Sequence, residues 1–177
     1  MADLGAAFDF AMELEGGGVV HTVPGDPGGT TKWGISQRAN PDLDIANLTR
    51  EQAMEVYDRR YWSPRRLGEL RYQSVADEIF EFTINADPAH QNGGVAVRTA
   101  QEAANDILEV AGIPDRLVED GIIGFNTLSV LNTLGGMGAL HIVAWRDRFN
   151  LLQLRYYRSL RRDLVNRFLL GWTRRVI

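Results

Sequence analysis

The chain has 177 residues, with 19 Lys and Arg against 23 Asp and Glu, and it contains no cysteine. A hydrophobic fraction of 45% and a charged fraction of 24% are typical of a globular protein of one domain, with room for a smaller attached lobe. The absence of cysteine excludes disulfides, thiolate metal sites and cysteine nucleophiles. The charge is uneven, because residues 1–144 carry a net −11 and residues 145–177 a net +7.

The apolar runs predict a protein without a membrane anchor. Residues 1–10 have neither the basic start nor the continuous apolar stretch of a secretory signal peptide. No apolar run approaches the roughly 18 residues that span a bilayer, so we expect no transmembrane segment. We therefore expect synthesis in the cytoplasm, with a separate delivery route for any action outside it.

The predicted elements are mostly helical. Apolar residues recur at helical spacing over 4–15, and the glycines that follow end this helix. Residues 19–35, with a turn-rich centre, predict a β-hairpin. Residues Thr49 to Gln52 form a capping box that begins a helix through about residue 61. Further helices are predicted over about 74–85, about 94–111, a short stretch near 127 that ends at Gly135-Gly136, and about 139–163. The pattern predicts an α+β fold, predominantly α-helical, with one small β-hairpin near the N-terminus.

The first helix and the hairpin carry the residues best suited to catalysis. Glu15 stands at the predicted helix C-terminus, where the helix dipole favours a protonated carboxyl, and three glycines leave space beside it. Such an acid suits proton donation to a glycosidic oxygen. Asp26 in the hairpin turn offers a second carboxylate, and Thr30 and Thr31 offer hydroxyls that hold a water. The alternative is that Glu15 is a solvated helix-end residue and that residues 26–29 are only a turn.

Residues 15–17 and 26–35 together resemble the signature of glycoside hydrolase family 108, the N-acetylmuramidases of phages and prophages. Residues 48–62, 80–85 and 171–176 resemble later parts of the same family. The resemblance implies a lysozyme-like fold. It also implies a muramidase (endolysin) that hydrolyses the β-1,4 bond between N-acetylmuramic acid and N-acetylglucosamine in peptidoglycan.

The resemblance also implies roles for individual residues. Glu15 becomes the catalytic acid of an inverting mechanism, Asp26 the second carboxylate and Thr31 the residue that positions the water. The expected substrate-binding residues are Trp33, Asn85, Glu81, His21 and Thr30. Ten residues separate Glu15 from Asp26, two more than the family's usual interval, so His21 or Thr22 is an alternative for part of the role of Asp26.

We expect a catalytic lobe over residues 1–92 and a helical lobe over residues 93–177, packed as one compact unit. The second lobe resembles the family's peptidoglycan-binding segment through Gln101 and the run from Asp120 to Thr127. A tight turn entering a helix explains that run equally well. The arginine-rich C-terminal segment either faces an anionic cell envelope or pairs with the acidic remainder of the chain. Five arginines of this segment could face an envelope or form such pairs, namely Arg155, Arg158, Arg161, Arg162 and Arg167.

The remaining patterns argue against other classes of protein. The three histidines are scattered, so we expect no metal and no cofactor. The acidic chain lacks an aromatic-basic motif, so we expect no nucleic acid. For a phage enzyme made in the host bacterial cytoplasm, a holin or a virion is the expected route to the wall. Two alternatives stay open: a catalytically weak peptidoglycan-binding or secretion-related protein on the same fold, and a lytic transglycosylase.

Overall fold

A computed structural model of the chain describes residues 1–15, 17–22, 29–87, 89 and 93–160, and, of these, all side chains except those of Leu14 and Glu15. The α-helices are α1 (Leu4–Glu15), α2 (Arg50–Tyr57), α3 (Gln73–Ala86), α4 (Val95–Val110), α5 (Phe125–Gly136) and α6 (Ala139–Ser159). Short helical turns lie between α2 and α3: η1 (Asp58–Trp62), η2 (Ser63–Arg65) and η3 (Leu67–Glu69). The strands are β1 (His21–Thr22), β2 (Thr30–Lys32) and β3 (Ile35–Ser36).

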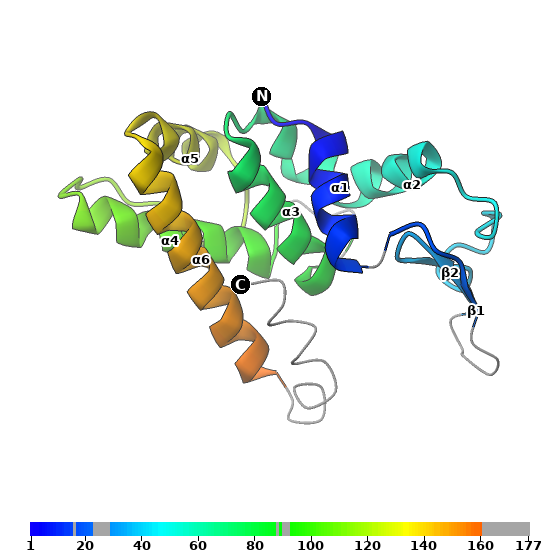
Figure 1. The fold of residues 1–177 in the computed structure, drawn as a ribbon. Helices are drawn as coiled ribbons and strands as arrows, with labels where there is room; N and C mark the ends of the chain where they lie inside the picture. The colour runs from blue at the N-terminus through cyan, green and yellow to red at the C-terminus, as the bar shows by residue number, and fades with distance from the viewer. Residues whose placement is uncertain (16, 23–28, 88, 90–92, 161–177) are drawn as a thin grey trace.

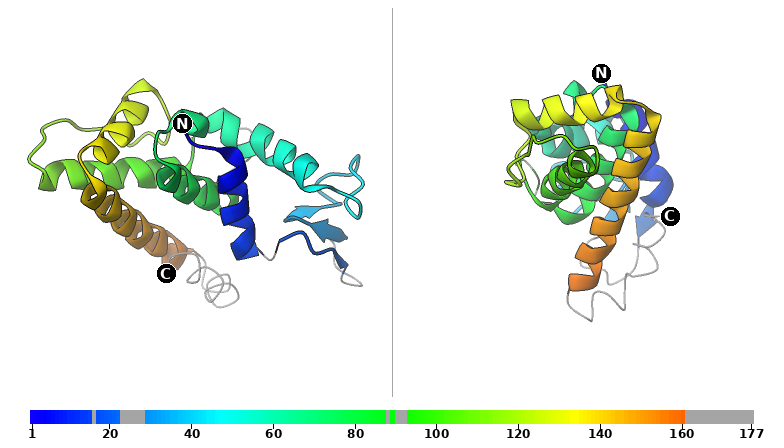
Figure 2. Two further views of the ribbon diagram at one scale, coloured as in Figure 1. Left: turned by 45° about the horizontal axis from the view of Figure 1, so that its top comes forward. Right: turned by 90° about the vertical axis from the view of Figure 1, so that its left-hand side faces the viewer.

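The three strands form one antiparallel sheet in the order β1-β2-β3. Figure 1 shows this sheet at one end of the molecule, beyond the C-terminal end of α1, with α4 and α5 at the opposite end. Figure 2 shows the same separation from another side. Among the described residues, no helix is both long enough and apolar enough to cross a membrane.

Helices α1 and α3 pack side by side and start at the same end. The Asp3 N–H donates to Gln73 Oε1 at 2.7 Å, and Gln73 Nε2 donates to the Asp3 carbonyl oxygen at 2.9 Å. The two helices have 12 and 14 residues, so at about 1.5 Å per residue they are almost equally long. Their C-terminal ends, with Glu15 on α1 and Asn85 on α3, therefore lie at the same end of the pair.

The junction between α3 and α4 is built around the buried carboxylate of Asp87. This carboxylate accepts hydrogen bonds from the backbone N–H groups of Val95 and Ala96 and so caps the N-terminus of α4. The guanidinium of Arg65 lies 3.9 Å from it, and neither side chain is exposed to solvent. A Cβ atom at Gly94 would overlap the carboxylate, which explains the glycine there. Burial raises the pKa of Asp87 against the opposing effect of its N–H donors and Arg65.

The fold class predicted from the sequence is confirmed: the chain is a predominantly α-helical, lysozyme-like α+β protein with a small sheet after the first helix. The capping box is also confirmed, since Thr49 Oγ1 accepts from the Gln52 N–H and Gln52 Oε1 accepts from the Thr49 N–H. The hairpin gains a third strand, because the chain turns back after Lys32 and pairs Ile35 with it.

The helix end predicted at Gly135-Gly136 is confirmed, because α5 ends at Gly136. The ring of Tyr72 occupies the space where a Gly135 side chain would stand, so this glycine also makes room for a neighbouring ring. The lobe boundary at residues 92/93 stays a prediction, and one hydrophobic core extends over both sides of it, from Ala7 to Tyr157.

Candidate active site

The C-terminal end of α1 faces the sheet. Phe8 is fully buried, and its ring lies 5.7 Å from that of Trp33, in the turn between β2 and β3. Position 15 follows Phe8 by seven residues, two helical turns, and therefore lies on the same face of α1. The Gly17 N–H donates to the Met12 carbonyl oxygen at 3.0 Å and closes the helix. The Glu15 side chain and the whole of Asp26 lie outside the described residues.

The sheet divides the expected hydroxyl and imidazole groups between its two faces. His21 pairs with Thr31, and Thr22 pairs with Thr30, whose hydroxyl oxygens are 3.3 Å apart. Because side chains alternate along a strand, Thr31 and His21 share one face while Thr30 and Thr22 share the other. Ile35, which packs into the core, belongs to the face of Thr30. The expected water-positioning residue and the expected substrate residue Thr30 therefore face opposite ways.

Trp33, one of the expected substrate-binding residues, occupies a half-buried position in the turn after β2. Its Nε1 donates to the Leu48 carbonyl oxygen at 3.4 Å. A Cβ atom at Gly18 would overlap its six-membered ring, so the glycine run after Glu15 makes room for this indole. The Trp33 carbonyl oxygen accepts from the Tyr57 hydroxyl at 2.9 Å. This contact was not predicted, because the spacing of Tyr57 is local to its helix and carries no information about a turn 24 residues away.

On α3, the two expected substrate residues contact each other. The exposed Asn85 donates from Nδ2 to Glu81 Oε1 at 2.8 Å and to the Glu81 carbonyl oxygen at 3.0 Å. Glu81 is only 3% exposed, and its second carboxylate oxygen accepts from Gln153 Nε2 of α6 at 3.2 Å. Glu81 thus links α3 to α6, and its burial corrects the expectation that it meets a substrate directly. Asn85 keeps an exposed position at the end of α3 where α1 also ends.

The segment that resembles a peptidoglycan-binding motif is held by internal hydrogen bonds. Gln101 is 1% exposed, and its Nε2 lies within hydrogen-bond distance of Asp120 Oδ1, the Ile122 carbonyl oxygen and Thr127 Oγ1. The hydrogen bond from Gln101 is the main cause that lowers the pKa of Asp120. These contacts favour the interpretation of the motif as a tight turn entering α5.

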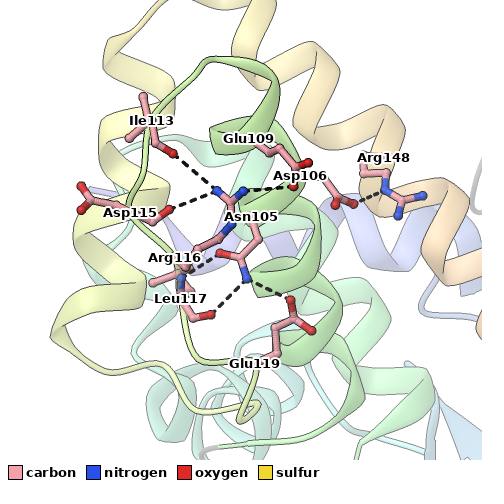
Figure 3. A network of polar contacts seen from close by, with 9 residues as sticks. All are labelled: Asn105, Asp106, Glu109, Ile113, Asp115, Arg116, Leu117, Glu119 and Arg148. Carbon is pink, nitrogen blue, oxygen red and sulfur yellow. Dashed lines mark hydrogen bonds and ion pairs between the residues drawn. The ribbon is translucent and has the colours of Figure 1, made fainter.

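A second amide ties the preceding loop to α4. Asn105 Oδ1 accepts from the Leu117 N–H at 2.7 Å, while its Nδ2 donates to the Leu117 carbonyl oxygen and to Glu119 (Figure 3). Arg116 in the same loop pairs with Glu109 of α4 at 3.0 Å. The loop is therefore an ordered part of the helical lobe.

The arginines of α6 divide into paired and exposed groups. Arg148 pairs with Asp106 and Glu102 of α4, and Arg146 lies 4.0 Å from Glu78 of α3. These contacts agree with pairing to the acidic remainder of the chain. Arg155 and Arg158 are exposed and make no ion pair with any described residue. Arg161, Arg162 and Arg167 lie outside the described residues. Within the described part of the chain, no cluster of three His, Asp or Glu side chains could hold a metal ion.

One family model matches part of the chain. Residues 8–86, 79 of the 177, match the model described as glycosyl hydrolase 108. The match takes in most of α1, the sheet, α2 and α3, so this domain contains the elements around the end of α1.

The chain also resembles a solved structure. The structure of Brucella abortus SagA has a TM-score of 0.61 and 24% sequence identity, over 97% of this chain and 90% of that one. At this identity the likeness concerns the fold. No curated protein matches the chain in sequence. The family match thus covers residues 8–86, whereas the fold is shared with SagA along nearly the whole chain.

Proposed function

We propose that this protein is a peptidoglycan muramidase, which hydrolyses the β-1,4 bond between N-acetylmuramic acid and N-acetylglucosamine. One observation carries the proposal: the family match over residues 8–86 encloses the Glu-Gly-Gly run, at the point where α1, α3 and the sheet converge. Two exposed polar residues near that point suit a sugar polymer, His21 on β1 and Asn85 on α3. The exposed Val19 and Val20 lie beside His21.

In the proposed mechanism, Glu15 is the general acid. It stands at the last position of α1, where the negative end of the helix dipole favours the protonated carboxyl. Glu15 gives its proton to the glycosidic oxygen as the bond to the anomeric carbon breaks. A water held by Thr31 attacks that carbon from the opposite face and loses its proton to Asp26. This inverting route requires a carboxylate separation of about 6.5–9.5 Å.

The proposed binding roles follow the exposure of each residue. Asn85 Nδ2 donates to the Glu81 carbonyl oxygen and to Glu81 Oε1, which leaves Asn85 Oδ1 to accept from the N–H of an N-acetyl group. His21 lies on the face of Thr31 and is suited to contact the same sugar. Thr30 binds from the other face only where the substrate wraps around the edge of the sheet. Glu81 and Trp33 support the site without contacting the substrate. Glu81 holds Asn85, and Trp33 holds the turn after β2.

Product analysis tests the proposal. Purified peptidoglycan would be digested with the full chain, reduced with borohydride and analysed by mass spectrometry. New muramitol ends support the proposal. New glucosaminitol ends contradict the bond assignment, and 1,6-anhydromuramic acid ends identify a lytic transglycosylase. Binding to peptidoglycan without any new ends identifies a catalytically weak wall-binding protein.

We further propose that the protein is a phage or prophage endolysin, made in the host cytoplasm and brought to the wall by a holin or within a virion. The exposed Arg155 and Arg158 would then favour an anionic envelope surface. Expression in a bacterial host with and without a holin tests the delivery route. Lysis that needs the holin supports it, whereas lysis at the same rate without a holin contradicts it.

A further inference from the structure

The turn between β2 and β3 is built on two residues with positive φ. Trp33 has φ +53° and Gly34 has φ +70°. A non-glycine residue in this left-handed region is strained, so surrounding contacts must hold it there. Among the described residues, only Trp33 and Arg66 are non-glycine residues with positive φ. The strained Trp33 lies two residues after Thr31.

The hydroxyl of Tyr57 is one of the contacts that hold the turn. It donates to the Trp33 carbonyl oxygen at 2.9 Å, across 24 residues of sequence. A Cβ atom at Gly34 would come within 2.7 Å of the same hydroxyl oxygen, so the backbone approaches Tyr57 as closely as glycine allows. Tyr57 itself is 4% exposed, and its ring contacts those of Phe8 at 5.5 Å and Phe80 at 6.2 Å. The donor is therefore fixed in the core by α1 and α3.

The indole of Trp33 connects this turn to the end of α1. Its six-membered ring fills the space over Gly18, three residues after Glu15. Its Nε1 is hydrogen-bonded to the Leu48 carbonyl oxygen, and the ring lies against Phe8 of α1. One side chain thus touches both the chain leaving α1 and the loop before α2. The turn, the exit from α1 and the core are joined through Trp33.

We propose that Tyr57 and Trp33 are positioning residues, which together set the distance between the end of α1, with Glu15, and strand β2, with Thr31. The proposal rests on the muramidase function above, because it assigns to these two residues the alignment of that reaction's acid and water. Neither residue touches the reacting atoms. Loss of the Tyr57 hydroxyl relaxes the turn at Trp33 and so shifts Thr31 relative to α1. A displacement of about 1 Å in a catalytic group can lower the rate about a hundredfold.

The test uses Tyr57→Phe, which removes one oxygen and keeps the buried ring. Tyr72→Phe is the matched control, because it is the same change in a tyrosine that packs against α5 near Gly135, away from the sheet. We expect Tyr57→Phe to lower kcat about 10- to 100-fold on soluble peptidoglycan fragments, with KM within twofold. The melting temperature should fall by only a few degrees, as for one lost hydrogen bond. Tyr72→Phe should keep kcat within twofold of the wild type.

A second measurement does not depend on activity. In hydrogen–deuterium exchange, Tyr57→Phe should raise the exchange of peptides covering residues 29–36, and Tyr72→Phe should leave that exchange unchanged. Gly18→Ala, which would push the indole away, should reproduce both the loss of kcat and the faster exchange.

An active wild type with unchanged kcat and unchanged exchange in Tyr57→Phe overturns the positioning role. Faster exchange with unchanged kcat overturns it too, because the restraint would then be structural only. An inactive wild type overturns the muramidase function instead, and the exchange data then decide the restraint alone.

Discussion

Removal of the Asp87 carboxylate should destabilise the junction between α3 and α4 strongly. In Asp87→Ala, the guanidinium of Arg65 stays buried without its carboxylate partner at 3.9 Å, and the N–H groups of Val95 and Ala96 lose their acceptor. Breaking a buried ion pair by removing one partner costs about 3–5 kcal/mol. Burial already opposes the charge of Asp87, as its raised pKa indicates, so we expect the lower end, about 3 kcal/mol. For a chain of this length that corresponds to a fall in Tm of about 6–12 °C.

Urea unfolding followed by circular dichroism measures this difference. Asp9→Ala is the matched control, because Asp9 pairs with Arg50 at 2.7 Å on the surface, with 60% of the Asp9 side chain exposed. An exposed pair contributes about 0–1 kcal/mol, so this variant should unfold close to the wild type. Asp87→Asn keeps an oxygen acceptor for α4 and should lie between the two. A loss in Asp87→Ala no larger than that in Asp9→Ala would refute the reasoning, because the buried carboxylate would then contribute no more than a surface one.

Three further predictions concern stability. Burial raises the pKa of Glu78 from 4.5 to about 7, so the stability contributed by its protonated carboxyl is fully present below pH about 4.5 and is lost as the pH rises through 7. Glu78→Gln, which cannot ionise, should therefore be more stable than the wild type at pH 8 by up to about 3 kcal/mol. Equal stability of the two proteins at pH 8 would contradict this. Asn105→Ala should lower the free energy of unfolding by about 2 kcal/mol and speed proteolysis between α4 and α5, since it leaves the Leu117 backbone without its partners; a wild-type digestion rate would contradict this. Thr49→Ala removes the cap of α2 and should cost about 1 kcal/mol in thermal unfolding, whereas Thr49→Ser should cost less.

Local signals in the sequence predicted most of the fold. Thr49 and Gln52 are three residues apart, and their capping box depends on nothing more distant. The start and the end of α1 were also predicted, because apolar spacing and helix-ending glycines are local features of the sequence. The π-helical turn at 58–62 was not predicted, since its residues have the spacing of an ordinary helix.

The surroundings of the candidate site depend on contacts that are distant in sequence. The half-buried position of Trp33 depends on Gly18 on one side and on Tyr57, 24 residues away, on the other. Glu81 is buried by Gln153, 72 residues further along the chain. Residue types and short spacings suggested candidate side chains for the site, whereas contacts distant in sequence decide which of the described ones are exposed and which are buried.

In the proposed mechanism, Glu15 supplies the proton for cleavage of the glycan. The most direct test compares Glu15→Gln with Glu13→Gln on purified peptidoglycan, by the rate at which new reducing ends form. Glu13 is an exposed glutamate on the same helix, two residues earlier, so the two variants lose the same charge. We predict that Glu15→Gln forms new ends at least a thousandfold more slowly, as expected when an essential general acid is removed, and that Glu13→Gln forms them at the wild-type rate. Equal rates for the wild type and Glu15→Gln, or no new ends with either, would contradict the claim.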